Sequence, residues 1–298
     1  MSSNYRKTII VNLDPGNDNI TYECSINIDD LITLEDVQTE FKLGPNGAMM
    51  YCMEYLEKNI SWLIEELKTY KDSYLLFDFP GQVELFTHHK SVRNIIKILE
   101  NHNHRLTCIH LVDSSYCIDA TKYISVLMTS LTTMMMLELP QINVFSKIDL
   151  LQNLGKLDFN LEYYTQVMDL SYLLYHLNQS STEKYYKLNG ALCELIEEFN
   201  LVGFQTLCIT DKHSVFNLLK EIDKANGYIF GGLTAGNESI FMAANATDLL
   251  SETREAQEKY FSGGTDADTQ KNETDDRKTL KNLISSLETD NIEIHEEF

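Results

Sequence analysis

The stretch YLLFDFPGQVE, residues 74–84, decides the fold class. It begins as an apolar run and continues through an aspartate, a proline and a glycine, which predicts a buried strand that ends near Asp78 and a sharp turn after it. An aspartate at the tip of a buried strand is costly unless a partner balances its charge. The alternative for this segment is an ordinary strand-to-helix turn in which Asp78 caps the helix.

Similar apolar runs lie at 8–13, 107–113 and 142–147, with a fifth at 204–210. Helical periodicity occupies the intervals, at about 47–70, 84–101, 119–136, 160–178, 183–199 and 213–226. Runs that are apolar on both faces fit parallel strands covered by helices on both sides. The alternation predicts an α/β, doubly wound, mostly parallel sheet, and such sheets place ligands at the carboxyl ends of their strands.

Composition excludes several functional classes. The 298 residues carry a formal net charge of −21, which argues against nucleic acid as a direct partner because phosphate surfaces require clustered Lys and Arg. No apolar run is long enough for a membrane span, and the N-terminus lacks the features of a signal peptide. Six cysteines without a CxxC pair indicate reduced thiols, so we expect a cytoplasmic protein.

The residues after Asp78 suit phosphate chemistry. Asp78 could hold a magnesium ion that is bound to a nucleotide, either directly or through water. Gly81 supplies a hinge whose N–H can meet a terminal phosphate, and Gln82 has the amide that orients an attacking water. At the end of the first run, Asp14 could help to hold magnesium or water, and a simple turn or cap at Asp14 is an equal alternative.

The fourth strand ends in Ser146-Lys147-Ile148-Asp149. One carboxylate can accept both the N1–H and the 2-amino donors of guanine, a pattern that adenine does not match. The aliphatic stem of Lys147 can lie over the ring. Such a pair is a weak signal by itself, and it becomes strong when it follows the Asp-x-Pro-Gly-Gln segment in the same chain.

A further turn, Gly44-Pro45-Asn46-Gly47, opens a helical run. Proline fixes φ and the two glycines permit a sharp turn, so Asn46 is held at a rigid tip. For an isolated tripeptide, an ordinary turn with a helix cap is the simpler interpretation.

Together these motifs resemble the GPN-loop GTPases, closest to the second of the three eukaryotic branches of that family. The segments that carry the resemblance are NLDP (12–15), YEC (22–24), LGPNGAMMYCMEYLE (43–57), DFPGQVELFTHH (78–89), HLVDSSYC (110–117), SKIDL (146–150), LEYYTQVMDLSYLL (161–174) and DKANGY (223–228). The resemblance covers residue 8 to about 230 and implies a P-loop NTPase-like fold over 1–232, with an acidic tail at 233–298 that is partly helical or disordered.

The resemblance also implies roles for individual residues. Gly44, Pro45 and Asn46 would form the GPN loop, with Asn46 near a partner's terminal phosphate. Gln82, Glu84 and Asp14 would position water. The remaining expected site residues are Asp78 for magnesium, and Gly81, Ser146, Lys147 and Asp149 for the nucleotide.

By the same resemblance, the cofactors are GTP or GDP with Mg2+, and the partner is another GPN-loop GTPase or a second copy of the chain. Family members assist the assembly and nuclear import of RNA polymerases, so subunits or assembly factors of polymerases II and III are expected contacts, with shuttling between cytoplasm and nucleus.

One family motif is not found. A GxxxxGK[ST] phosphate loop should precede the first run, and the printed sequence has none. Gly231–Gly236 has the glycine spacing, but Asn237-Glu238 follows where Lys-Ser/Thr is required, so we reject it. We expect the strand neighbours of the absent segment to keep unpaired backbone groups. We favour a missed N-terminal segment; the alternative is a nucleotide-free pseudo-GTPase scaffold that dimerises with a related GTPase.

Other signals predict little. His88-His89 and His102/His104 lack a second cluster at ligand spacing, so we do not expect a metal site there. In the tail, helical patterns lie at 239–260 and 277–288, separated by a polar, acidic segment. Leu280, Leu283, Ile284 and Leu287 share one face of the second pattern, which would suit a partner-binding helix.

Overall fold

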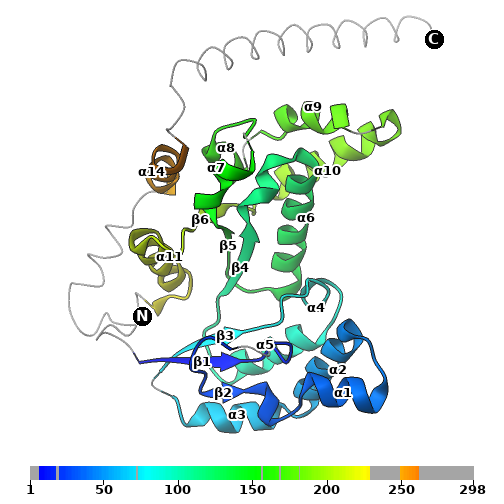
Figure 1. Ribbon diagram of the computed structural model, residues 1–298, viewed down its shortest axis with the longest axis vertical. Coiled ribbons are helices and arrows are strands. Elements are labelled where there is room, and N and C mark those ends of the chain that lie inside the picture. Colours follow the sequence, from blue (N-terminus) through cyan, green and yellow to red (C-terminus); the bar gives the residue numbers. More distant parts are fainter. Residues whose placement is uncertain are drawn as a thin grey trace, which may run out of the picture.

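The computed structural model describes residues 7–17, 20–71, 73–155, 157–167, 169–180, 182–228 and 249–261, and Figure 1 shows their arrangement. The chain has α/β architecture with two parallel three-stranded sheets, each covered by helices. The expected alternation of strands and helices is confirmed.

The first sheet has the order β2-β1-β3, with β1 (Thr8–Asn12) between β2 (Ile26–Asn27) and β3 (Tyr74–Asp78). The parallel register pairs Thr8 with Tyr74 and Asn12 with Asp78, so both strands end at the same edge. The short strand β2 was not predicted, because a two-residue strand has no periodicity to detect.

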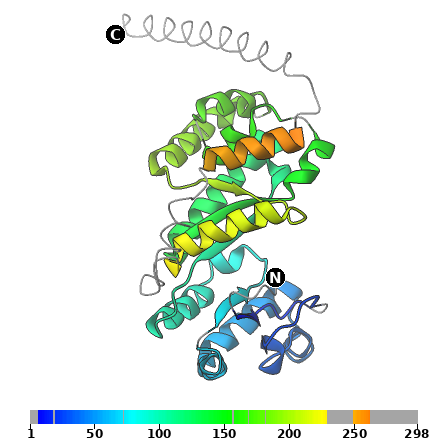
Figure 2. The same ribbon diagram turned by 90° about the vertical axis from the view of Figure 1, so that its left-hand side faces the viewer.

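The second sheet has the order β4-β5-β6, with β5 (Gln141–Ser146) between β4 (Cys108–Asp113) and β6 (Phe204–Thr206). Side chains alternate between its faces. Phe145 joins the core beneath α6 (Ala120–Leu137), whereas Val144 packs with Leu218 of α11 (Lys212–Ala225) on the opposite face. Helices therefore cover both sides of this sheet, as Figure 2 shows.

The helices around the first sheet are shorter than the sequence predicted. The expected helix at 47–70 is two helices, α2 (Pro45–Lys58) and α3 (Ile60–Lys68). They separate at Asn59, whose backbone is not helical (φ −107°, ψ 27°) and whose N–H and Nδ2 both donate to the Tyr55 carbonyl. The expected helix at 84–101 is likewise α4 (Glu84–Thr87) and α5 (Ser91–Asn101), and α1 (Leu34–Phe41) was not predicted.

The helices beyond β5 follow the same pattern. The expected helix at 160–178 divides at Val167, which has a left-handed φ of 50° and ends α8. The elements here are α7 (Leu151–Leu154), α8 (Leu161–Gln166), α9 (Ser171–Ser180), α10 (Tyr186–Phe199) and α14 (Leu249–Phe261).

Among the described residues, no strand of one sheet is hydrogen-bonded to a strand of the other. β3 lies at the edge of the first sheet and β4 lies at the edge of the second. Apolar side chains on these two edge strands are exposed: Leu76 is 41% exposed and Leu111 is 60% exposed. The Tyr74 hydroxyl donates to Asp223 of α11 at 3.3 Å and so connects the two halves.

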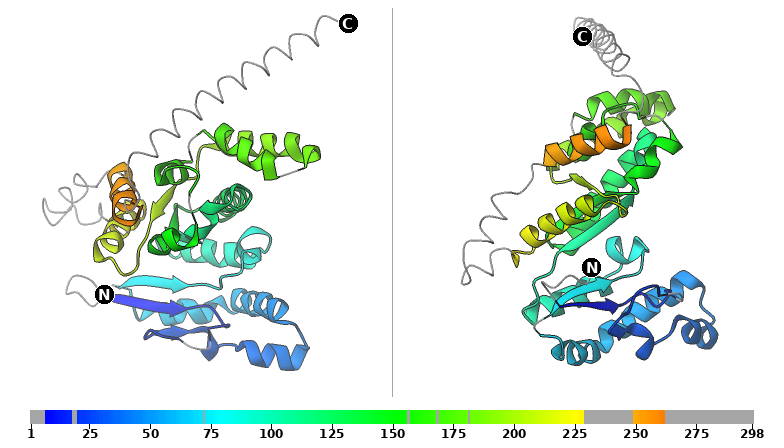
Figure 3. Two further views of the ribbon diagram at one scale, coloured as in Figure 1. Left: turned by 45° about the horizontal axis from the view of Figure 1, so that its top comes forward. Right: turned by 60° about the vertical axis from the view of Figure 1, so that its left-hand side comes forward.

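The predicted domain boundary at 232/233 stays a prediction. Part of the helical pattern expected at 239–260 is present as α14, which packs beside α8 and β6 (Figure 3). Residues 229–248 and 262–298, with Gly231–Gly236 and the pattern at 277–288, lie outside the described residues. Within the described ranges, none of the helices has the length and hydropathy that crossing a bilayer requires.

Candidate functional site

The strand ends of the first sheet bring two acidic residues to one edge. The Leu13 N–H donates to the Asp78 carbonyl at 2.8 Å, which continues the β1–β3 pairing one residue past the strands. Asp14 follows Leu13, so it comes after β1 at the edge of the sheet where β3 ends in Asp78. Asp78 and Asp14, which were expected to hold magnesium and water, thus lie at the same edge of the sheet.

Asn12 sets the conformation of the segment that carries Asp14. This asparagine is fully buried, and its Nδ2 donates to Asn27 Oδ1 at 2.9 Å and to the Asp14 carbonyl. Its Oδ1 accepts the Asp14 N–H at 3.2 Å, and the Asp14 carboxylate accepts the Gly16 N–H at 2.9 Å. A buried amide with its donors and acceptors paired fixes a turn more strongly than an exposed one.

Tyr22 is a site residue to which the sequence analysis gave no role. Its hydroxyl donates to one carboxylate oxygen of Asp78. Partial burial, followed by this hydrogen bond to a carboxylate, raises the pKa of Tyr22. The hydroxyl therefore stays a donor and orients Asp78. The signal was present in the sequence, because the segment YEC belongs to the motifs quoted above.

The GPN residues lie next to Gln82 of the same chain. Pro45 is the first residue of α2 and Gly44 is its N-cap, so Asn46 projects from an exposed first turn. Gln82 Nε2 donates to Asn46 Oδ1 at 3.2 Å. The structure thus brings together two amides that the sequence had placed in different subunits' sites. Glu84 begins α4 and Gly81 is exposed just before it.

The residues that the sequence led us to expect at the guanine base lie at the end of β5. Lys147 has a left-handed backbone (φ 58°) and its exposed side chain forms an ion pair with Asp113, with Nζ and Oδ2 2.8 Å apart. The Ser114 hydroxyl donates to the Lys147 carbonyl at 3.1 Å, and Ser146 donates to the Val112 carbonyl at the same distance. The ends of β4 and β5 are therefore tied together.

Asp113 was not predicted as a site residue. Burial opposes its ionisation, but hydrogen bonds from Lys147 and Ser115 outweigh burial and lower the pKa of Asp113 to about 2. The same contact raises the pKa of Lys147. By contrast, Asp149 is half-buried, and no partner for its carboxylate is recorded in the described part of the chain. Asp149 is thus available as an acceptor.

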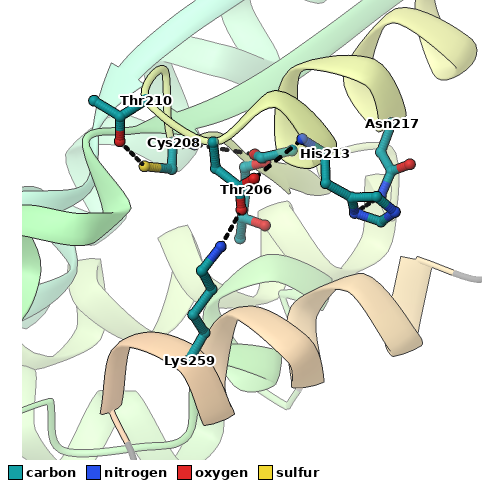
Figure 4. A network of polar contacts seen from close by, with 8 residues as sticks. Thr206, Cys208, Thr210, His213, Asn217 and Lys259 are labelled. Carbon is teal, nitrogen blue, oxygen red and sulfur yellow. Dashed lines mark hydrogen bonds and ion pairs between the residues drawn. The ribbon is translucent and has the colours of Figure 1, made fainter.

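The loop after β6 packs against the turn that carries Lys147 and Asp149. The Ile148 N–H approaches the Leu207 carbonyl at 3.4 Å, and Ile148 packs with Cys208 and with Ala256 of α14. Figure 4 shows the polar contacts around Cys208, including the ion pair between Lys259 of α14 and Asp211, the N-cap of α11. The contact between α14 and the turn at residues 146–149 was not predicted from the sequence.

The structure groups the expected residues into two sets. Asp14, Asp78, Gln82 and Asn46 belong to the first sheet and its helices, and Ser146, Lys147 and Asp149 belong to the second. Parallel strands place both sets at carboxyl ends. Within the described residues, no group of three or more His, Cys, Asp or Glu side chains could hold a metal ion by itself.

Comparison with known proteins identifies the family. A family model described as "Conserved hypothetical ATP binding protein" matches residues 1–228. GPN-loop GTPase QQT1 of Arabidopsis thaliana is 54% identical over 261 residues, which are 86% of this chain and 88% of that protein. GPN-loop GTPase 2 of Danio rerio is 51% identical over 86% of this chain and 83% of its own length.

The chain belongs to the GPN-loop GTPase family. GPN-loop GTPase 2 of Saccharomyces cerevisiae is also similar, at 39% identity over 98% of this chain and 86% of that protein. Among solved structures, an apo-form GTPase from Pyrococcus abyssi matches with a TM-score of 0.61 and 22% identity, over 74% of this chain and 86% of that one. This likeness shows that the two chains share a fold.

The Tyr22 hydrogen bond yields a stability prediction. Tyr22→Phe removes a half-buried donor to a charged acceptor, so the free energy of unfolding should fall by about 1–2 kcal/mol, measured by urea denaturation. Tyr116→Phe is the matched control, because Tyr116 is 43% exposed and no hydrogen bond of its hydroxyl is recorded in the described ranges. Equal stability of the two variants would contradict the role of Tyr22.

The Asp113–Lys147 contact yields a pH prediction. NMR titration of the Asp113 carboxyl should give a midpoint of about 2, and Lys147→Met should move it towards the ordinary value of about 3.9. Because the folded-state pKa is depressed, the stability from this contact is present above about pH 4 and is lost as the pH falls towards 2. Lys122→Met, which removes an exposed lysine elsewhere, should leave the midpoint unchanged; an equal shift in both variants would contradict the assignment.

Proposed function

We propose that this chain is a magnesium-dependent GTPase that acts as a dimer with another GPN-loop GTPase or a second copy, and that it assists assembly and nuclear import of RNA polymerases II and III. The observation that carries the enzymatic part is the grouping of Asp14, Asp78, Gln82 and Asn46 at the strand ends of the first sheet. Asp149, for whose carboxylate the described residues provide no recorded partner, follows the strand end of the second sheet. The names of the relatives support the choice of GTP.

Base recognition rests on Asp149 and Lys147. The Asp149 carboxylate can accept the two donors on the Watson–Crick edge of guanine. Asp113 binds the Lys147 ammonium, and the aliphatic stem of the lysine can serve as a surface for the ring. An adenine ring offers no matching pair of donors, and this difference supports GTP over ATP.

The phosphate end fits a magnesium ion. Tyr22 occupies one oxygen of Asp78, and no protein partner is recorded in the described ranges for the other. A carboxylate oxygen at a strand end is the ligand type that Mg2+ prefers. When bound, Mg2+ neutralises charge on the phosphates. The side chains of Gln82, Glu84 and Asp14 then orient the attacking water, with Asp14 held by Asn12 and Gly16.

Asn46 contributes an uncharged donor to the terminal phosphate. Asn46 is exposed at the first turn of α2, and its Oδ1 accepts a hydrogen bond from Gln82, so its NH2 group is the part of the amide that can donate to a phosphate. An exposed, rigid tip suits insertion into a second subunit's site. The alternative is a nucleotide-free scaffold that lends Asn46 to a related GTPase.

Nucleotide choice tests the enzymatic proposal. Asp149→Asn replaces one acceptor oxygen with a donor, so the protein purified from its own cells should lose affinity for GTP and gain affinity for xanthosine triphosphate. A bidentate pair contributes about 1–3 kcal/mol, so the GTP:XTP preference should change by roughly 10- to 100-fold in fluorescent-nucleotide titrations. Asp169→Asn, an exposed aspartate elsewhere, is the control.

The outcomes separate the two candidate functions. If wild-type protein binds no guanine nucleotide with magnesium, the scaffold alternative replaces the GTPase proposal. If GTP binds and Asp149→Asn leaves the preference unchanged, the guanine-reading role of Asp149 is wrong.

Mixing two inactive variants tests dimeric action. Asn46→Ala keeps a nucleotide site but lacks the amide, and Asp149→Asn keeps the amide but does not hold GTP. If Asn46 acts in the partner's site, an equal mixture should recover roughly a quarter of wild-type turnover, because half of the dimers are mixed and each has one intact site. Turnover no higher than the average of the two variants would show that Asn46 acts within its own chain or not at all.

A further inference from the structure

The helix α10 carries an apolar stripe that the described residues leave uncovered. Leu188, Leu192, Leu195 and Phe199 recur at helical spacing along one face. Leu188 is 54% exposed, Leu195 is 37% exposed and Phe199 is 42% exposed. The core of the second sheet is contacted by a different face of α10, through Cys193 and Ile196. Figure 1 shows α9 and α10 at the end of the molecule opposite α1 and α2.

Packing within the described residues does not explain why the apolar side chains of the α10 stripe remain exposed. Scattered exposed leucines are common on protein surfaces, whereas a contiguous apolar row beside a polar flank marks a binding surface. Two acidic side chains, Glu194 and Glu198, lie exposed on the flank that faces solvent. The occupant should therefore be an amphipathic helix with leucines on one face and basic residues beside them.

The chain contains such a segment in residues 277–288. We propose that this segment docks on the α10 stripe of the same chain. Its apolar residues Leu280, Leu283, Ile284 and Leu287 share one face, and Arg277 and Lys281 lie on one flank of that face. In a helix, residues 280 to 287 would span about 11 Å, whereas the α10 row from 188 to 199 spans about 17 Å, so the shorter row would fit on the longer.

The connection is long enough for docking within one chain. The described structure ends at Phe261 of α14, and α14 packs against α8 in the same half of the molecule as α10. The residues between 261 and 277 can bridge up to about 50 Å when extended. Opposite charges on the two flanks set the orientation, since Arg277 and Lys281 meet Glu194 and Glu198 only when the two apolar rows face each other.

Hydrogen–deuterium exchange on the full chain tests this docking. The amides of 277–288 should exchange more slowly than in a free peptide of the same sequence, and Leu195→Glu should accelerate them by about tenfold or more. Phe216→Glu is the matched control, because Phe216 is 47% exposed on α11 and lies outside the stripe. Exchange in 277–288 that is as fast as in the free peptide would overturn the proposal.

Charge reversal on the two flanks provides a second test of the docking, and it leaves the apolar residues of α10 unchanged. Glu194→Lys with Glu198→Lys should accelerate exchange in 277–288, and adding Arg277→Glu with Lys281→Glu should restore the protection. Failure of the four-residue variant to restore it would contradict the orientation. Protection that disappears on about hundredfold dilution would show that a second copy, rather than the same chain, occupies the stripe.

Discussion

The parallel pairing of β1 with β3 is the constraint on which the site depends. Because Asn12 pairs with Asp78 in register, the residues that follow both strands reach the same edge of the sheet. A shift of one residue would reverse the facing of every side chain on β1. Buried Asn12 then fixes the turn at Asp14, and Tyr22 fixes the carboxylate of Asp78. The strand pairing thereby sets where the two acidic residues lie, and hydrogen bonds with Asn12 and Tyr22 hold them there.

The second sheet applies the same constraint to the guanine-reading residues. Asp113 pairs with Ser146 in the β4–β5 register, so the Asp113 carboxylate lies within reach of Lys147. The ion pair between exposed and half-exposed groups contributes little stability by itself. Its effect is geometric, since it holds the Lys147 ammonium at Asp113. Ile148 of this turn packs with Cys208, which follows β6, and with Ala256 of α14, so both segments support the turn.

Much of the fold was predictable because buried strands and their terminal residues have strong local signals. The five main strands and the positions of Asp78, Lys147 and Asp149 at strand ends followed from apolar runs and turn residues. The helix breaks at Asn59 and Val167 were not predicted, because a single residue with non-helical backbone angles scarcely changes the hydrophobic periodicity of the sequence. The roles of Asp113 and of α14 at the turn after β5 were not predicted, because they depend on contacts between segments that are distant in sequence.

The central claim is that the strand ends of the two sheets form one nucleotide site. The most direct measurement is an NMR titration of the isotopically labelled protein with GDP and magnesium, following the backbone amides of residues 78–84 and 146–149 together. One site predicts that both sets shift with a single dissociation constant, the first set responding to phosphate and magnesium and the second to the base. Shifts confined to one set, or two different constants, would contradict the claim.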